Sequence, residues 1–124
     1  MKKKYIYFAI VIFFAASIAA IIYSYTSKNK TKNPETYAFL PRIGEAAKSP
    51  EWQKVKEESY KLFQQLKANP NDGKSLVALA TMYIREARVT ANYAYYDKAA
   101  LAAINKALQL NPQDFEALTL QSLV

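Results

Sequence analysis

The sequence predicts an all-α protein in which one apolar N-terminal helix precedes a stack of amphipathic helices. Residues 5–25 carry no charge and no proline, and apolar residues recur at three- and four-residue steps after residue 50. Such steps place side chains on one face of an α-helix. We therefore expect four segments: a basic tail (1–4), a transmembrane helix (5–25), a polar linker (26–49) and a helical domain (50–124).

The N-terminal run has the length and edges of a membrane helix. Crossing a bilayer takes about 20 apolar residues, and residues 5–25 supply 21 of low polarity. Aromatic rings favour the level of the lipid headgroups, and both ends of the run carry tyrosines (Tyr5, Tyr7, Tyr23 and Tyr25). We expect a single-pass membrane anchor.

A cleaved secretory signal is the alternative, because Ser17 and Ala19 are small residues at the two positions that a signal peptidase reads. The apolar stretch continues to Tyr23 and exceeds the ~7 to 15 residues of a signal core, which favours an uncleaved anchor. The chain has no cysteine, so a lipoprotein anchor and disulfides are excluded.

The charges around the run predict its orientation. Three lysines precede it and three follow within the next few residues, so the positive-inside asymmetry is weak. A short charged N-terminal tail usually stays cytoplasmic. We expect a protein of the bacterial inner (cytoplasmic) membrane with its C-terminal domain in the periplasm.

The formal net charge of +7 does not indicate a nucleic-acid partner. Residues 1–25 and 26–48 each carry +3, whereas residues 49–124 carry only +1. Lysines that flank a membrane helix meet anionic headgroups, and no basic stripe is left to follow a phosphate backbone.

The polar linker contains one apolar island at residues 37–40, which we expect to pack on the first helix of the domain. That helix should begin where Ser49 caps it and Pro50 takes its first position, and its apolar face should carry Trp52 and Leu66.

Two matching stops divide the domain. Pro70 and Pro112 each follow an asparagine and end a helix, and Asp72 and Asp114 each stand where the next helix needs an N-cap. The chain thus repeats one pattern of helix, stop and cap.

Between these stops lie two spaced motifs, Leu76-x2-Leu79-Ala80-x2-Tyr83 and Ala100-x3-Ile104-x2-Ala107-x4-Pro112. The pair resembles the tetratricopeptide repeat, a helical hairpin that stacks into a solenoid. The resemblance implies a fold of one complete repeat with flanking helices, and a protein that binds other proteins.

The spacing departs from the family in one respect. Pro70 and Pro112 lie 42 residues apart, against about 34 in an ordinary repeat. Lengthening each helix by about one turn keeps both apolar faces in phase. We expect a long helical hairpin that turns near Thr90 and Asn92.

Residues 114–124 begin a further helix and then stop without a polar cap, which leads us to expect a longer repeat protein.

The resemblance also implies a binding groove. In the family, the first helix of each repeat lines a concave groove on the side away from the second helix. Here that face carries Lys74, Val77, Ala78, Thr81, Ile84 and Arg85. These residues differ from the family's clamp for terminal carboxylates. They favour an extended or helical peptide held by apolar contact, with Arg85 or Lys74 meeting an acidic group.

The tyrosines divide into two groups. Tyr83 occupies the structural tyrosine position of the repeat and is expected in the core with its hydroxyl near the surface. Tyr93, Tyr95 and Tyr96 lie near the expected turn, where they either pack between the two helices, which we favour, or form an exposed aromatic anchor for a partner.

The composition argues against an enzyme. The chain lacks histidine and cysteine and has only two glycines, which leaves no common general base, no thiolate and no phosphate-binding loop. Glu57 and Glu58 are neighbours on a helix and are expected on its solvated face. We expect no catalytic residue, metal, cofactor or small-molecule substrate.

These observations predict a non-catalytic scaffold, anchored in the membrane, that binds a peptide or protein partner in the groove. The alternative is that the repeats are the docking appendage of a larger envelope protein, such as a sensor, an enzyme or a cytochrome c maturation subunit.

Overall fold

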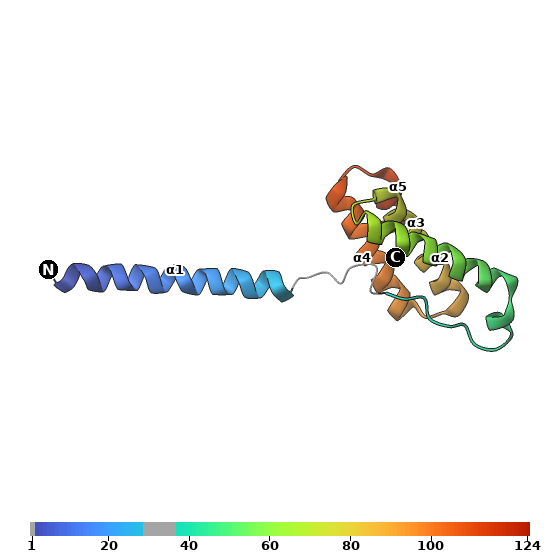
Figure 1. The fold of residues 1–124 in the computed structure, drawn as a ribbon, viewed down its shortest axis with the longest axis horizontal. Helices are drawn as coiled ribbons and strands as arrows, with labels where there is room; N and C mark the ends of the chain where they lie inside the picture. The colour runs from blue at the N-terminus through green and yellow to red at the C-terminus, as the bar shows by residue number, and fades with distance from the viewer. Residues whose placement is uncertain (1, 29–36) are drawn as a thin grey trace. The chain divides into compact units, whose positions relative to one another are not determined.

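The computed structural model describes residues 2–28 and 37–124 and divides the chain into two compact units, Met1–Thr31 and Lys32–Val124. Across the described ranges all regular structure is helical, which confirms the all-α class (Figure 1). The helices are α1 (Lys2–Lys28), the 3-10 helix η2 (Gly44–Lys48), α2 (Pro50–Ala68), α3 (Gly73–Thr90), α4 (Tyr93–Leu110) and α5 (Phe115–Gln121).

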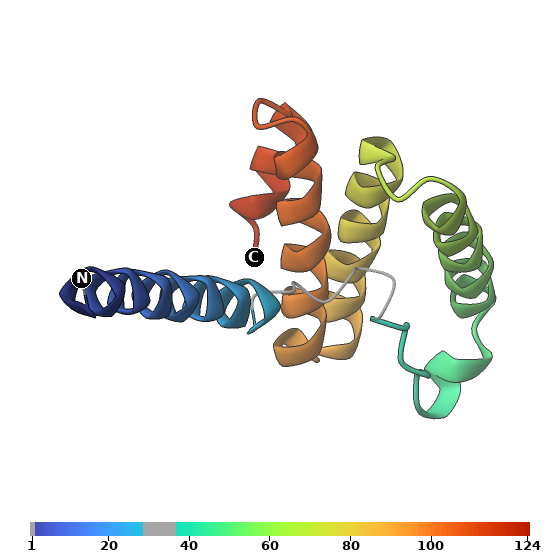
Figure 2. The ribbon, with the colours of Figure 1, turned by 60° about the vertical axis from the view of Figure 1, so that its left-hand side comes forward.

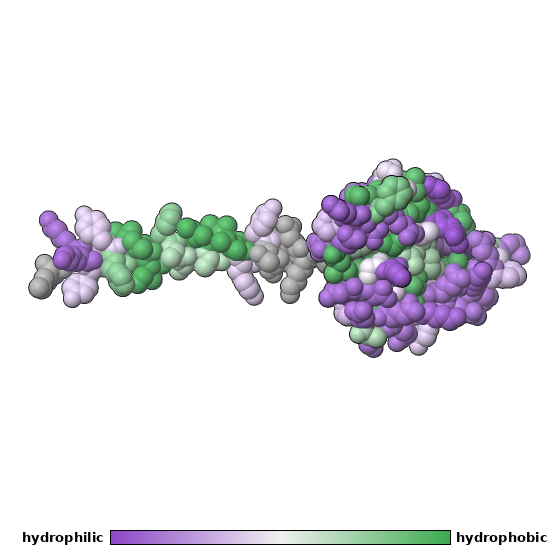
Figure 3. Space-filling view, turned by 90° about the horizontal axis from the view of Figure 1, so that it is seen from above, coloured by the Kyte–Doolittle hydropathy of each residue, from purple (hydrophilic) through white to green (hydrophobic). Residues whose placement is uncertain are grey.

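Helix α1 is the one helix in the described ranges that is long and apolar enough to cross a membrane. The candidate span is Lys2–Tyr25, with a mean hydropathy of 2.5. From Lys2 to Tyr25 its side chains are exposed, except for the half-buried Ser17, and Phe13 retains 77% of its accessible surface; Figure 3 shows the apolar surface along this helix. Exposing so much apolar area to water is unfavourable. This finding rests on length and composition, which an N-terminal signal sequence shares.

The predicted N-caps are confirmed. The Ser49 hydroxyl accepts a hydrogen bond from the Trp52 amide at 3.2 Å, with Pro50 at the first position of α2. The Asp72 carboxylate accepts from the Ser75 amide at 3.3 Å, and the Asp114 carboxylate accepts from the Ala117 amide at 3.0 Å. Each cap satisfies an amide that has no partner within its helix.

The lengthened hairpin is also confirmed. Helices α3 and α4 each have 18 residues, and they lie side by side in Figures 1 and 2. The turn between them is made by Ala91, whose φ of 57° is in the left-handed region, and by Asn92. A left-handed conformation at a residue other than glycine costs roughly 1 to 2 kcal/mol, so the packing of the two helices must offset it.

The core is formed where α3 and α4 face one another. Small side chains allow the two backbones to approach closely, and large ones fill the remaining space. Helix α2 adds Leu66 to this cluster and α5 adds Ala117 and Leu120. The residues without exposed surface that α3 and α4 contribute to this cluster are Leu76, Leu79, Ala80, Tyr83, Ala99, Ala100, Ala103 and Ile104.

Part of the expected polar linker belongs to the folded unit. Residues 29–36 lie outside the described ranges, but residues 37–43 run extended along the helices and are followed by η2, which the sequence did not predict. The expected packing of the apolar island is confirmed at Phe39, which contacts a cluster of Trp52, Val55 and Met82. Phe39 also reaches the main core, so this segment covers more than one helix.

We expect Asp72→Ala to lower the free energy of unfolding by about 1 kcal/mol at pH 7, whereas Asp72→Asn, which keeps a capping oxygen, costs less. Hydrogen bonds from Ser75 lower the pKa of Asp72 in the folded state. The charged cap therefore contributes fully above the ordinary aspartate pKa of about 3.9, and this contribution disappears as the pH falls through the lower folded value. Urea denaturation of the full chain in detergent, followed by far-ultraviolet circular dichroism from pH 7 to pH 2, measures both effects. An Asp72→Ala variant as stable as the parent at pH 7 would contradict this role.

Candidate functional site

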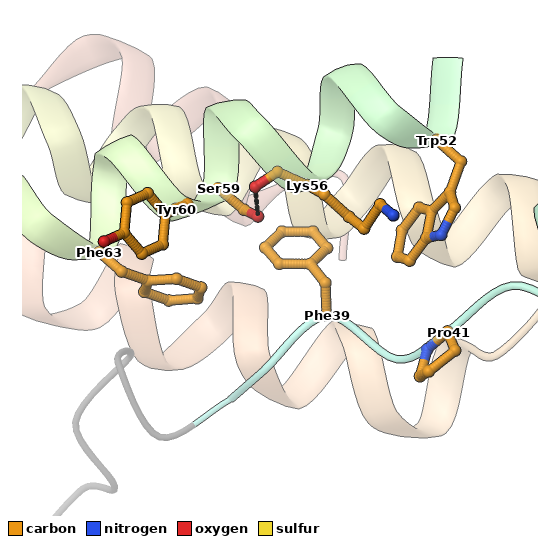
Figure 4. A pocket seen from close by; sticks show the side chains of 7 residues that line it. All are labelled: Phe39, Pro41, Trp52, Lys56, Ser59, Tyr60 and Phe63. Atoms are coloured by element: carbon orange, nitrogen blue, oxygen red, sulfur yellow. Dashed lines mark hydrogen bonds between the residues drawn. The ribbon is translucent and has the colours of Figure 1, made fainter. Parts of the chain in front are cut away.

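The most elaborate set of contacts outside the helical core surrounds residues 37–43, which we call the strap. The strap has no helical or strand structure, and Figure 4 shows the ring of Phe39 pointing from it toward side chains of α2. Side chains from three helices line the groove that holds it. We call this the strap groove and define it by Trp52 and Phe63 of α2, Tyr83 and Glu86 of α3, and Tyr95 and Tyr96 of α4.

Three tyrosine hydroxyls hydrogen-bond to the backbone of the strap. Tyr83 donates to the carbonyl of Tyr37, and Tyr95 donates to the carbonyl of Ala38 at 2.7 Å. The hydroxyl of Tyr96 accepts from the amide of Leu40 at 3.0 Å. These bonds satisfy both the strap's peptide groups and the buried ends of the tyrosines.

Phe39 is the aromatic anchor of the strap. Its ring stacks on Tyr83 with the centroids 4.8 Å apart and the planes 16° from parallel. The rings of Phe63 and Tyr96 lie 6.2 Å and 6.0 Å away at tilted angles. Aromatic pairs at such distances add about 0.5 to 1.5 kcal/mol to the effect of burial alone.

Arg42, near the C-terminal end of the strap, forms an ion pair with α3. Its Nε donates to Oε2 of Glu86 at 3.1 Å and its Nη2 donates to Oε1, so the pair is bidentate. Arg42 is 7% exposed and Glu86 only 1%. The guanidinium also lies 3.6 Å from the exposed carboxylate of Glu51 and 5.3 Å from the Trp52 ring centroid. The hydrogen bond to Glu86 raises the pKa of Arg42 and outweighs the opposing effect of burial, so Arg42 stays charged.

Sequence reasoning did not identify this ion pair. The sequence analysis does not single out Glu86, although it follows Tyr83 by three residues and Leu79 by seven and so lies on the buried face of α3. A carboxylate in that stripe is the signal that could have revealed a buried partner. Arg42 stands between Pro41 and Gly44 in an irregular segment, where the pattern offers no comparable signal.

The six predicted groove residues of α3 are not all at the surface. Lys74, Ala78 and Arg85 are exposed and Thr81 is half-buried. Val77 and Ile84 are only 4% and 7% exposed, because they belong to the core cluster that includes Ala117 and Leu120 of α5. Of the six predicted groove residues, the other four are therefore the ones accessible from solvent.

Three of these residues line a shallow hollow of about 480 Å³ between α2, α3 and α5. We call it the α3 cleft. Lys74 does not line it. Its lining residues are Glu58, Lys61, Leu62, Gln65, Ala78, Thr81, Met82, Arg85 and Glu116.

The three tyrosines near the hairpin turn have separate environments. Tyr96 is buried at 1% exposure and packs on Tyr83, whereas Tyr93 is 51% exposed. Tyr95 is half-buried and meets Tyr37 edge-on at 5.9 Å. Tyr95 and Tyr96 thus bind the strap, a role that the sequence did not indicate. The Tyr83 hydroxyl lies beneath the strap, since Tyr83 has no exposed surface.

The neighbouring carboxylates Glu57 and Glu58 have different surroundings. Glu57 is exposed and Glu58 forms an exposed ion pair with Lys54 at 3.8 Å. Residues 2–28 and 37–124 contain no group of three or more acidic side chains placed to hold a metal ion.

No family model, curated protein or solved structure matches this chain. The likeness to tetratricopeptide repeats rests on the motif residues described above.

We expect Arg42→Met to lower the free energy of unfolding by about 3 kcal/mol or more, because it leaves Glu86 buried without a counter-charge. The paired change Arg42→Met with Glu86→Leu should recover most of this loss, since two apolar side chains replace the ion pair. Glu51→Ala is the control and should cost below about 1 kcal/mol, because that carboxylate is exposed. Urea denaturation of the full chain in detergent compares the four proteins. A double variant no more stable than Arg42→Met would show that the pair does not act as a unit.

We also expect the fold to lose stability above about pH 10, the ordinary tyrosine pKa. Burial raises the pKa of Tyr83, of Tyr95 and of Tyr96, so the unfolded chain loses these protons at a lower pH than the folded chain does. Stability must then fall as the pH rises through that range. Unfolding free energies at pH 8 to 11.5 give the slope, and Tyr83→Phe should make it shallower. Tyr93→Phe is the exposed control; an equal slope in Tyr83→Phe and the parent would exclude the buried phenol as its source.

Proposed function

We propose that this chain is a non-catalytic scaffold, anchored in a membrane by α1, that binds a peptide segment of a partner protein in the α3 cleft. The observation that carries the proposal is that Ala78, Thr81 and Arg85, which the repeat pattern assigns to a binding groove, line one hollow together with α2 and α5. Concave sites with a few polar groups at their edges are the usual places for ligands.

The lining of the cleft suits a short peptide that presents an apolar side chain. Leu62, Ala78 and Met82 supply apolar surface, and charged residues of both signs surround it. Arg85 lies within 4.0 Å of no carboxylate in the described ranges, so its charge is available to an acidic group of the partner. The cleft therefore favours a partner peptide in which an apolar side chain stands beside an acidic residue.

The location follows from α1 and from the charges beside it. We place α1 in the cytoplasmic membrane of a bacterium as a single uncleaved span, with the three N-terminal lysines inside and the helical domain in the periplasm. Lysines on both sides of the span would meet anionic headgroups.

The test is crosslinking and mass spectrometry of the tagged full-length protein in its own membranes. We expect Ala78→Arg to remove the partners, because an exposed alanine in the cleft becomes a long charged side chain with little effect on helix stability. Gln53→Arg, on an exposed position of α2 outside the cleft, is the matched control and should keep them. Partners retained by Ala78→Arg would show that the cleft is not the binding surface.

A further inference from the structure

The strap groove contacts the strap in the manner of a peptide-recognition site. Such sites combine hydrogen bonds to the peptide backbone with pockets for selected side chains. Here the backbone contacts come from the hydroxyls of Tyr83, Tyr95 and Tyr96, which reach residues 37, 38 and 40 in turn. Because these hydrogen bonds run to main-chain atoms, peptides of many sequences could form them.

Three side chains of the strap contact the groove: the half-buried Tyr37 meets Tyr95 edge-on, and Phe39 and Arg42 make the closest contacts. Phe39 enters the aromatic cluster, and Arg42 forms the buried pair with Glu86. Ala38, Leu40 and Pro41 are exposed, and Ile43 is 92% exposed, so these positions are not read. The groove therefore recognises an aromatic residue followed three positions later by an arginine.

Because of Glu86, the groove is stable only when a cation occupies it. Its carboxylate is 99% buried in the presence of the strap, and its side chain sits on α3, a rigid part of the core. A carboxylate in such a place is strongly destabilising without a cation beside it. The guanidinium of Arg42 meets this need with two parallel hydrogen bonds, a geometry that lysine cannot reproduce.

The strap is also separable from the helices that it covers. The hydrogen bonds described between the strap and the helices run to the side chains of Tyr83, Glu86, Tyr95 and Tyr96 and not to helix backbone groups. The chain leaves the strap at Gly44, the first residue of η2, whose φ is 68°. Releasing the strap would break its contacts with the tyrosines, the aromatic cluster and Glu86 without unwinding α2, α3 or α4.

We propose that the strap groove is a peptide-binding site in which the strap is an intramolecular ligand, and that it accepts a separate extended peptide with an aromatic-x-x-Arg pattern in the strap's place. This site uses Tyr83 and Glu86 of α3 and not the cleft residues Ala78, Thr81 and Arg85. It is therefore independent of the function proposed above. A tethered ligand competes at an effective concentration in the millimolar range, so a separate peptide binds measurably only when the strap is weakened or the peptide is present in excess.

The experiment uses the full-length chain in detergent micelles. Its strap is weakened by Phe39→Ala, and a fluorescently labelled peptide with the sequence of residues 37–44 is titrated by anisotropy. We expect saturable one-to-one binding that is about tenfold or more tighter than to the unaltered chain, whose own strap competes. The matched control peptide carries alanine in place of its aromatic residue at position 39 and of its arginine, and should not bind. Trp52, the single tryptophan of the chain, lies beside Arg42 and reports occupancy through its emission.

Further variants keep the test decisive. The double variant Phe39→Ala with Arg42→Ala should bind the peptide still more tightly, provided that it folds. Circular dichroism checks its folding. If the double variant is unfolded, the result for Phe39→Ala alone decides the test. Glu86→Gln in the Phe39→Ala chain should abolish the preference for arginine over alanine in the peptide, whereas Ala78→Arg should leave binding unchanged. Absence of binding to a folded Phe39→Ala chain, or equal binding of the control peptide, would overturn the proposal.

Discussion

The buried pair of Arg42 and Glu86 is the constraint on which the rest of the helical unit depends. Glu86 lies in the stripe of α3 that faces the core, where an unpaired carboxylate would be prohibitively unfavourable. The cation that pairs with it, Arg42, comes from outside the hairpin, on the strap. The strap in turn covers Tyr83 and Tyr96, so this ion pair fastens a largely apolar, irregular segment over an aromatic cluster, and Arg42 also lies near Glu51 in the first turn of α2.

Two kinds of surface arise on α3 as a result. One face is closed by the strap, through hydroxyls, rings and a carboxylate that all have partners. Another face opens between α2 and α5, where Ala78 and Arg85 are exposed. Both suit recognition, which is why we propose binding at each and test the two with different variants.

Much of the fold follows from local signals. Asp72 and Asp114 were identified as caps because a carboxylate before a helix satisfies its free amides, and that interaction lies within four residues of chain. The hairpin was predicted because two added turns keep the apolar faces in phase. The candidate site could be predicted less well from the sequence. Val77 and Ile84 were expected in a groove, yet the sequence could not show that α5 packs in the same cluster as these residues, since α5 is only seven residues long.

The sequence by itself determined the apolar N-terminal helix, the caps, the proline stops and the length of the hairpin, because each depends on the spacing of neighbouring residues. Only the tertiary structure decided the partners of Glu86, Tyr83 and Tyr95, which lie 44, 46 and 57 residues away along the chain. The physical reason is that a buried charge or hydroxyl requires a hydrogen-bond or ion-pair partner, but the residue type alone does not determine which residue that partner is. Which residue meets that need is set by how the irregular segment of residues 37–43 crosses the helices, and no periodic pattern encodes that path.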